Sequence, residues 1–128
     1  MPKHFIVKPL DIVKTDRFIN QIIPAEGVIS SIEFHDDMIF IKLKDPTGVL
    51  DVTLLQSKVK KYGPMLKKIK NYETTRIQVE GLLQLFPEGV ESERGYEMIL
   101  NTMKIINKPS ILNAAINTES FDFNKTKR

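Results

Sequence analysis

The chain contains no cysteine among its 128 residues. This excludes disulfide bridges, thiolate metal ligands and thiol nucleophiles, and it suits a reducing compartment. Its two histidines, His4 and His35, lack the short spacing of a metal-binding motif. We therefore expect neither a metal ion nor another cofactor.

Long apolar runs are also missing. No stretch approaches the roughly 20 apolar residues that a membrane span requires. The N-terminal sequence MPKHFIVKPLDIVK lacks the uninterrupted apolar core of a secretory signal. We expect an intracellular protein with no membrane partner, and the sequence leaves open whether it is cytoplasmic or nuclear.

Neither sign of charge is in large excess. Nineteen Lys and Arg residues against sixteen Asp and Glu residues give a net charge of +3. This balance permits a polyanionic partner without requiring one. The sequence also contains no phosphate-binding Walker loop, nucleophile elbow, dinucleotide fingerprint or H-E-x-x-H motif. We therefore expect a protein that is not an enzyme.

Five segments show the two-residue period of β-strands. In the second, Ile39, Ile41 and Leu43 alternate with Phe40 and two lysines, which predicts an apolar inner face and a cationic, aromatic outer face. The expected strands are Ala25–Phe34, Met38–Lys44, Val49–Leu55, Thr74–Phe86 and Tyr96–Ile106.

One segment, residues 57–71, has a helical period. An apolar stripe is spaced for one face of a helix, and six lysines occupy the other faces, which usually indicates a solvated surface. Ser57 is the expected N-cap, and Gly63-Pro64 predicts a kink or a break. The stripe consists of Val59, Tyr62, Leu66 and Ile69.

Turn signals and proline positions set the expected boundaries. Asp36-Asp37 makes a tight turn, Gly27 suits a bulge, and Asp45-Pro-Thr-Gly48 has the residues of a β-turn. Residues 1–24 are expected to be an N-terminal arm, either a helical turn or extended. Residues 25–108 form the expected domain, and 109–128 a short C-terminal helix followed by a polar tail.

Three strands, a helix and two strands are the order of an OB fold. We therefore predict an all-β protein, a five-stranded antiparallel barrel with one helix between the third and fourth strands. A split βαβ fold would need a helix after the first strand, and the turn at Asp36-Asp37 leaves no room for it.

The second strand and the turn after it also carry a family resemblance. Phe40-Ile-Lys-Leu43-Lys44-Asp45-Pro-Thr-Gly48-Val-Leu-Asp51 resembles the pattern F-x-x-L-R-D-x-x-G-x-x-Q of the anticodon-binding OB domain in class II aminoacyl-tRNA synthetases for Asp, Asn and Lys. It is similar also to the OB domain of bacterial replicative polymerase alpha subunits, and Val79-Glu80-Gly81 matches the V-x-G of such domains. The resemblance implies that Phe40 stacks on a base. Asp51 stands in place of the Gln and Lys44 in place of the Arg.

The strand pattern, without the family resemblance, also predicts that Phe40 stacks on a base. An outward ring costs free energy unless it is covered, and a stacked base would cover it while Lys42 and Lys44 meet phosphates. The alternative is that the N-terminal arm covers Phe40, through Phe5, Ile6 or Phe18. Further candidates for nucleic-acid contact are Phe34, Arg76, Gln78, Phe86 and Tyr96.

Two classes of function remain. The first is a module that binds single-stranded DNA or RNA, with a tRNA anticodon reader as a special case. The second is a protein-interaction subunit, such as the small OB subunits of replication protein A-like and telomere-capping complexes. In that case an apolar patch near Ile111–Ile116 would dock the partner.

Overall fold

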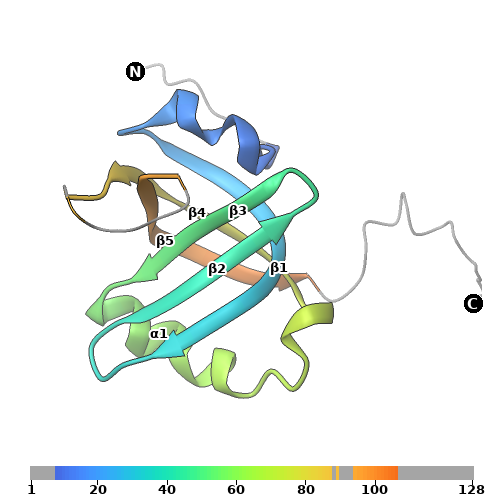
Figure 1. The fold of residues 1–128 in the computed structure, drawn as a ribbon. Coiled ribbons are helices and arrows are strands. Elements are labelled where there is room, and N and C mark those ends of the chain that lie inside the picture. The colour runs from blue at the N-terminus through green and yellow to red at the C-terminus, as the bar shows by residue number, and fades with distance from the viewer. Residues whose placement is uncertain (1–7, 88, 90–93, 107–128) are drawn as a thin grey trace, which may run out of the picture.

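Five strands close into a barrel within the residues that the computed structural model describes, 8–87, 89 and 94–106 (Figure 1). The order around the barrel is β1-β2-β3-β5-β4. Neighbours are antiparallel except β3 and β5, which pair in parallel. The predicted all-β barrel is therefore confirmed. The strands are β1 Ile22–Phe34, β2 Ile39–Asp45, β3 Gly48–Leu54, β4 Arg76–Leu85 and β5 Tyr96–Ile106.

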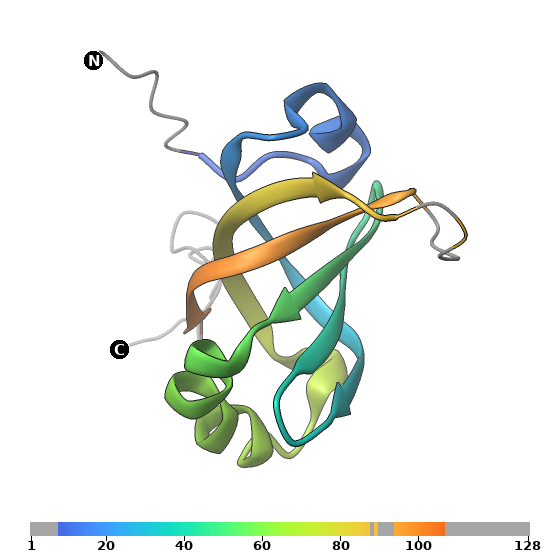
Figure 2. The same cartoon turned by 90° about the vertical axis from the view of Figure 1, so that its left-hand side faces the viewer.

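Helical segments cover the two ends of the barrel (Figure 2). The α-helix α1, Gln56–Lys67, follows β3. The short 3-10 turn η2, Tyr72–Thr74, lies between α1 and β4. The 3-10 helix η1, Ile12–Phe18, covers the opposite end, where its residue Ile12 is fully buried.

The helix differs from the prediction in two details, the absence of a break and the identity of the N-cap residue. The helix continues through Gly63-Pro64 without a break. Pro64 lacks the N–H that would bond to the carbonyl of Lys60, but Lys60 is exposed, so water can take that bond. Leu55, not Ser57, is the N-cap residue, and no side chain caps the helix there.

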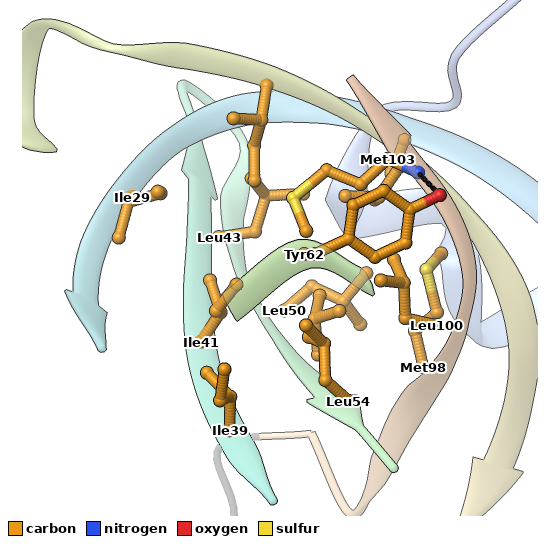
Figure 3. Packing of buried hydrophobic residues seen from close by; sticks show 14 of the residues in the cluster. Ile29, Ile39, Ile41, Leu43, Leu50, Leu54, Tyr62, Met98, Leu100 and Met103 are labelled. Atoms are coloured by element: carbon orange, nitrogen blue, oxygen red, sulfur yellow. Dashed lines mark hydrogen bonds between the residues drawn. The ribbon is translucent and has the colours of Figure 1, made fainter. Parts of the chain in front are cut away.

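The core follows the predicted alternation of β2 and β3. Ile39, Ile41 and Leu43 are buried together with the inward residues of β3. Tyr62 of α1 points into the barrel, and its hydroxyl oxygen accepts a hydrogen bond from the Met103 N–H at 3.3 Å (Figure 3). The helix therefore closes its end of the barrel with an aromatic ring that is also bonded to β5.

The first strand has a bulge, but at a different residue from the one expected. The pairing of β1 with β2 shifts between Ile29 and Ser31, whereas the sequence pointed to Gly27. At Gly27 the two strands approach closely, and a Cβ atom there would collide with the carbonyl oxygen of Lys44. Glycine is required at this position by close approach of the backbone.

Asp45 fastens the N-terminal segment to the barrel. Its Oδ2 accepts the Ile12 N–H at 2.9 Å, and its Oδ1 accepts the N–H groups of Thr47 at 2.7 Å and Gly48 at 3.0 Å. The Thr47 hydroxyl donates to the same Oδ1 at 2.6 Å. Burial raises the pKa of Asp45, but these hydrogen bonds together lower it below the usual value. The described part of the expected arm, residues 8–24, is thus bonded to the barrel through Ile12.

The expected C-terminal helix and tail, 109–128, lie outside the described residues, as do residues 1–7. Among the residues that are described, no helix has both the length and the apolarity to cross a membrane.

Candidate functional site

Outward side chains of the barrel form two adjacent rows that cross the strands. The cross-strand partners follow from the register of the sheet. The apolar row contains Ile22, Leu82, Ile99, Thr53 and Phe40. The polar row beside it contains Gln84, Glu97, Asp51, Lys42 and Ser31.

Phe40 lies on the outer face, as predicted, with 38% of its surface exposed. Its strand partners are Glu33 on β1 and Thr53 on β3, and the His35 ring meets it edge-on with the ring centroids 5.4 Å apart. Phe18, one of the residues expected to cover it, packs against the core instead. Phe5 and Ile6, the others, lie outside the described residues.

Two hollows meet at Phe40. One, of about 350 Å³, runs along the polar row past Lys42 and Asp51. The other, of about 420 Å³, runs along the apolar row past Leu82 and Ile99. Both are lined by Phe40, Thr53 and Phe86. The structure therefore brings Phe86, a predicted site residue, to the same place as Phe40.

Three charged groups of this face already have partners on it: Lys42 and Asp51 pair with each other, and Glu97 accepts from Thr53. Lys42 Nζ lies 2.6 Å from Asp51 Oδ1. The Thr53 hydroxyl donates to Glu97 Oε1 at 2.5 Å. Lys44 is exposed on the same outward register of β2 as Phe40, four residues farther along the strand. Of the two predicted lysines, Lys44 is thus the one with no ion pair among the described residues.

Phe34 does not belong to this face. The bulge after Ile29 changes which residues of β1 point inward, so Phe34 pairs with buried Ile39. It lines a separate hollow beside α1, where Lys67 Nζ lies 5.6 Å from the centre of its ring. Phe34, a further candidate for nucleic-acid contact, therefore lies apart from Phe40, with 36% of its surface exposed.

Arg76 and Gln78 lie elsewhere on the barrel. Arg76 pairs with Val28, and its Nη2 forms an ion pair with Glu26 Oε2 at 3.1 Å. Gln78 pairs with Glu26 on one side and Lys104 on the other. The structure does not bring these two residues together with Phe40.

Tyr96 is inside the barrel, so its predicted role as an exposed aromatic is wrong. Only 3% of its surface is exposed, and its hydroxyl shares a hydrogen bond with the Thr15 hydroxyl at 2.5 Å. Tyr96 shares one face of β5 with the buried residues Met98 and Leu100. This two-residue period in the sequence is the signal that places Tyr96 inside the barrel.

Several lining residues were absent from the predicted set. Thr53, Leu82, Glu97 and Ile99 reach the site because β3 pairs with β5 and β5 with β4. No group of three or more His, Asp or Glu side chains in the described part of the chain could hold a metal ion.

No protein-family model matches the sequence. The aspartate--tRNA(Asp/Asn) ligase of Hydrogenobaculum sp. (strain Y04AAS1) is 30% identical over 101 residues. The matched region covers 76% of this chain and 17% of the ligase, so the chain spans a small part of that relative's length.

Solved structures share the barrel. The asparaginyl-tRNA synthetase of Pyrococcus horikoshii complexed with asparaginyl-adenylate matches with a TM-score of 0.63 and 16% identity, over 79% of this chain and 23% of that one. An OBody bound to hen egg-white lysozyme matches with a TM-score of 0.64 and 13% identity, over 85% of this chain and 100% of that one. The chain is an OB-fold domain.

This OB domain is related in sequence to the Asp/Asn-tRNA ligase and shares its fold with the asparaginyl enzyme. The resemblance of the motif from Phe40 to Asp51 to the Asp and Asn synthetases is thereby confirmed. The OBody shares the fold alone, because its identity is low.

Proposed function

We propose that this OB domain binds single-stranded DNA or RNA on the outer face of β2 and β3, with Phe40 stacking on a base. The observation that carries the proposal is the exposed Phe40 ring at the junction of two hollows. An exposed aromatic ring costs free energy in water, and a base stacked on it typically contributes about 1–3 kcal/mol.

The size of the hollows supports a ligand of this kind. At about 350 and 420 Å³, they fall in the range of about 300–1,000 Å³ typical of ligand pockets. Phe86 lines both and offers a second aromatic side chain next to the first. The proposed activity is binding, without catalysis.

The relationship to the tRNA ligase supports a nucleic-acid ligand. A tRNA anticodon loop is one form of single strand that this face would accept. Asp51 and Lys44, in place of the Gln and Arg of the motif, change the groups that would read the base. The activity of the whole ligase is not transferred, because the chain matches 17% of it.

Single strands should bind more tightly than duplex of the same length and sequence. The reason is that Phe40 can stack only on a base that is not already stacked between neighbours. The affinity should fall only gently with salt, because Lys42 is paired with Asp51 and few cations remain for phosphates. Fluorescence anisotropy with a mixed-sequence oligonucleotide, single-stranded and annealed, at two salt concentrations measures both. Equal or tighter binding of duplex would contradict the proposal.

A protein partner is the second candidate, favoured by one observation. The apolar row continues from Phe40 past Ile99 and Leu82 to Ile22, which is 58% exposed. A row made mostly of apolar side chains suits a protein partner better than a charged nucleic-acid strand. If binding of a protein partner is the main function, Ile22→Ser should abolish that binding. The same substitution should leave the affinity for oligonucleotides unchanged.

A further inference from the structure

Three carboxylates stand near the ring that would stack on the base, and one of them, Asp51, is paired with Lys42. Glu33 faces Phe40 from β1, and Asp51 and Glu97 stand in the polar row beside it. Among the described residues that line the two hollows, three are carboxylates and one, Lys42, is a cation. The negatively charged phosphates of a strand would therefore be repelled from the hollows and stay outside them.

Two hydrogen-bond donors of the same surface are bonded to these carboxylates. The Thr53 hydroxyl proton goes to Glu97, and one N–H of Lys42 goes to Asp51. A carboxylate accepts about four hydrogen bonds and donates none. The surface around Phe40 thus offers a base three carboxylates as acceptors, beside the amide of Gln84 and the hydroxyl of Ser31. Two of its donors, Thr53 and Lys42, already bond to carboxylates.

The edges of the bases differ in how they suit such a surface. Cytosine and adenine each present an exocyclic amino group, and guanine presents an amino group beside a ring N–H. Uracil and thymine present carbonyl oxygens on both sides of their single ring N–H. Carboxylates attract the amino groups and repel the carbonyl oxygens.

We propose that the Phe40 site selects bases that carry an exocyclic amino group over uracil and thymine. This inference rests on the proposed binding of single strands. The change from Gln to Asp51 in the motif fits it, because Gln both donates and accepts whereas Asp only accepts. Asp51 and Glu97 are the selecting groups, with Phe40 holding the base in place.

The test compares two pyrimidine strands, because cytosine and uracil differ mainly in the edge that the carboxylates would face. Octamers of cytidine and of uridine are titrated with the full chain at neutral pH, followed by fluorescence anisotropy. We expect the cytidine octamer to bind about ten-fold more tightly, since one good contact to a base edge discriminates by about that factor. Replacing cytosine by 2-pyrimidinone, which lacks only the amino group, should remove the advantage.

Two variants locate the cause. Asp51→Asn and Glu97→Gln keep the side-chain size and replace an acceptor oxygen by a donor amide. Each should bring the ratio of cytidine to uridine affinity toward one. Glu73→Gln removes the same charge on η2, away from the hollows, and should leave the ratio unchanged.

The outcomes separate this inference from the function on which it rests. Equal or tighter binding of uridine would overturn the selectivity and leave single-strand binding intact. A ratio that neither variant changes would also overturn it, because the carboxylates would not be its cause. Failure of the chain to bind any single strand would overturn the proposed function, and the selectivity with it.

Discussion

At the scale of single residues, Asp45 explains much of the motif in the second strand. Its carboxylate accepts hydrogen bonds from both the turn after β2 and the start of η1. The Asp and Gly of the pattern therefore serve the fold, whereas Phe40 is directed outward. One motif thus contains a structural part and a part that is free to bind a ligand.

Asp45→Asn should lower the free energy of unfolding by about 1–3 kcal/mol at neutral pH, because it weakens a group of hydrogen bonds to a charged acceptor. The pKa of Asp45 is lowered in the folded chain. Its stabilising contribution is therefore complete above the unfolded pKa, near 3.8, and is lost as the pH falls through the lower folded value.

Denaturant unfolding of the two proteins at several pH values measures this contribution. The difference in unfolding free energy should be constant from neutral pH down to about 4 and should shrink below it. A difference that grows on acidification would contradict the role given to Asp45.

Residue positions were predictable wherever a strand alternates without interruption. Phe40 was placed correctly because buried Ile39 and Ile41 flank it. The direction of Phe34 could not be predicted in this way, because the bulged residue between Ile29 and Ser31 changes the alternation for the rest of β1. A bulge depends on how two strands pair, and that information is not contained in either strand by itself.

At the scale of elements, the closest contacts of the barrel depend on glycine. Gly81 of β4 lies against β5, where an added Cβ atom would collide with the carbonyl oxygen of Ile99 and the side chain of Met98. The V-x-G of the fourth strand is thereby explained by strand packing. Ile99 belongs to the apolar row, so this packing also shapes the site.

Gly81→Ala should destabilise the fold by about 1–3 kcal/mol, as overpacking of a well-packed core does. Gly63→Ala in α1 is the matched control, because a Cβ atom there meets only ordinary contacts of 3.7 Å or more. That substitution should stabilise the chain by about 0.5–1 kcal/mol through helix propensity. Thermal melting of both variants is the measurement, and a Gly81→Ala variant as stable as the parent would contradict the packing.

The order of elements was predictable, but the pairing that completes the site was not. Strands, helix and turns follow from local patterns, so the barrel was expected. The parallel pairing of Asp51 with Glu97 and of Thr53 with Ile99 joins segments far apart in the sequence. No local pattern specifies that register, and Glu97 and Ile99 were missed for this reason.

At the scale of the whole molecule, helical segments cover both ends of the closed barrel. α1 closes one end with Tyr62, and η1 closes the other with Ile12. The outer surface of β2, β3 and β5 is left with an exposed aromatic ring and two hollows. The central claim is that this outer surface binds a single strand through Phe40.

Replacing Phe40 and Phe34 in turn by alanine tests that claim most directly. The two rings have nearly equal exposure, 38% and 36%, but Phe34 lies beside α1. Phe40→Ala should weaken binding of a mixed-sequence single strand by about 1–3 kcal/mol and leave the melting temperature nearly unchanged. Phe34→Ala should leave the affinity of the folded protein unchanged. A Phe40→Ala variant that melts earlier but binds as tightly as the parent would contradict the account.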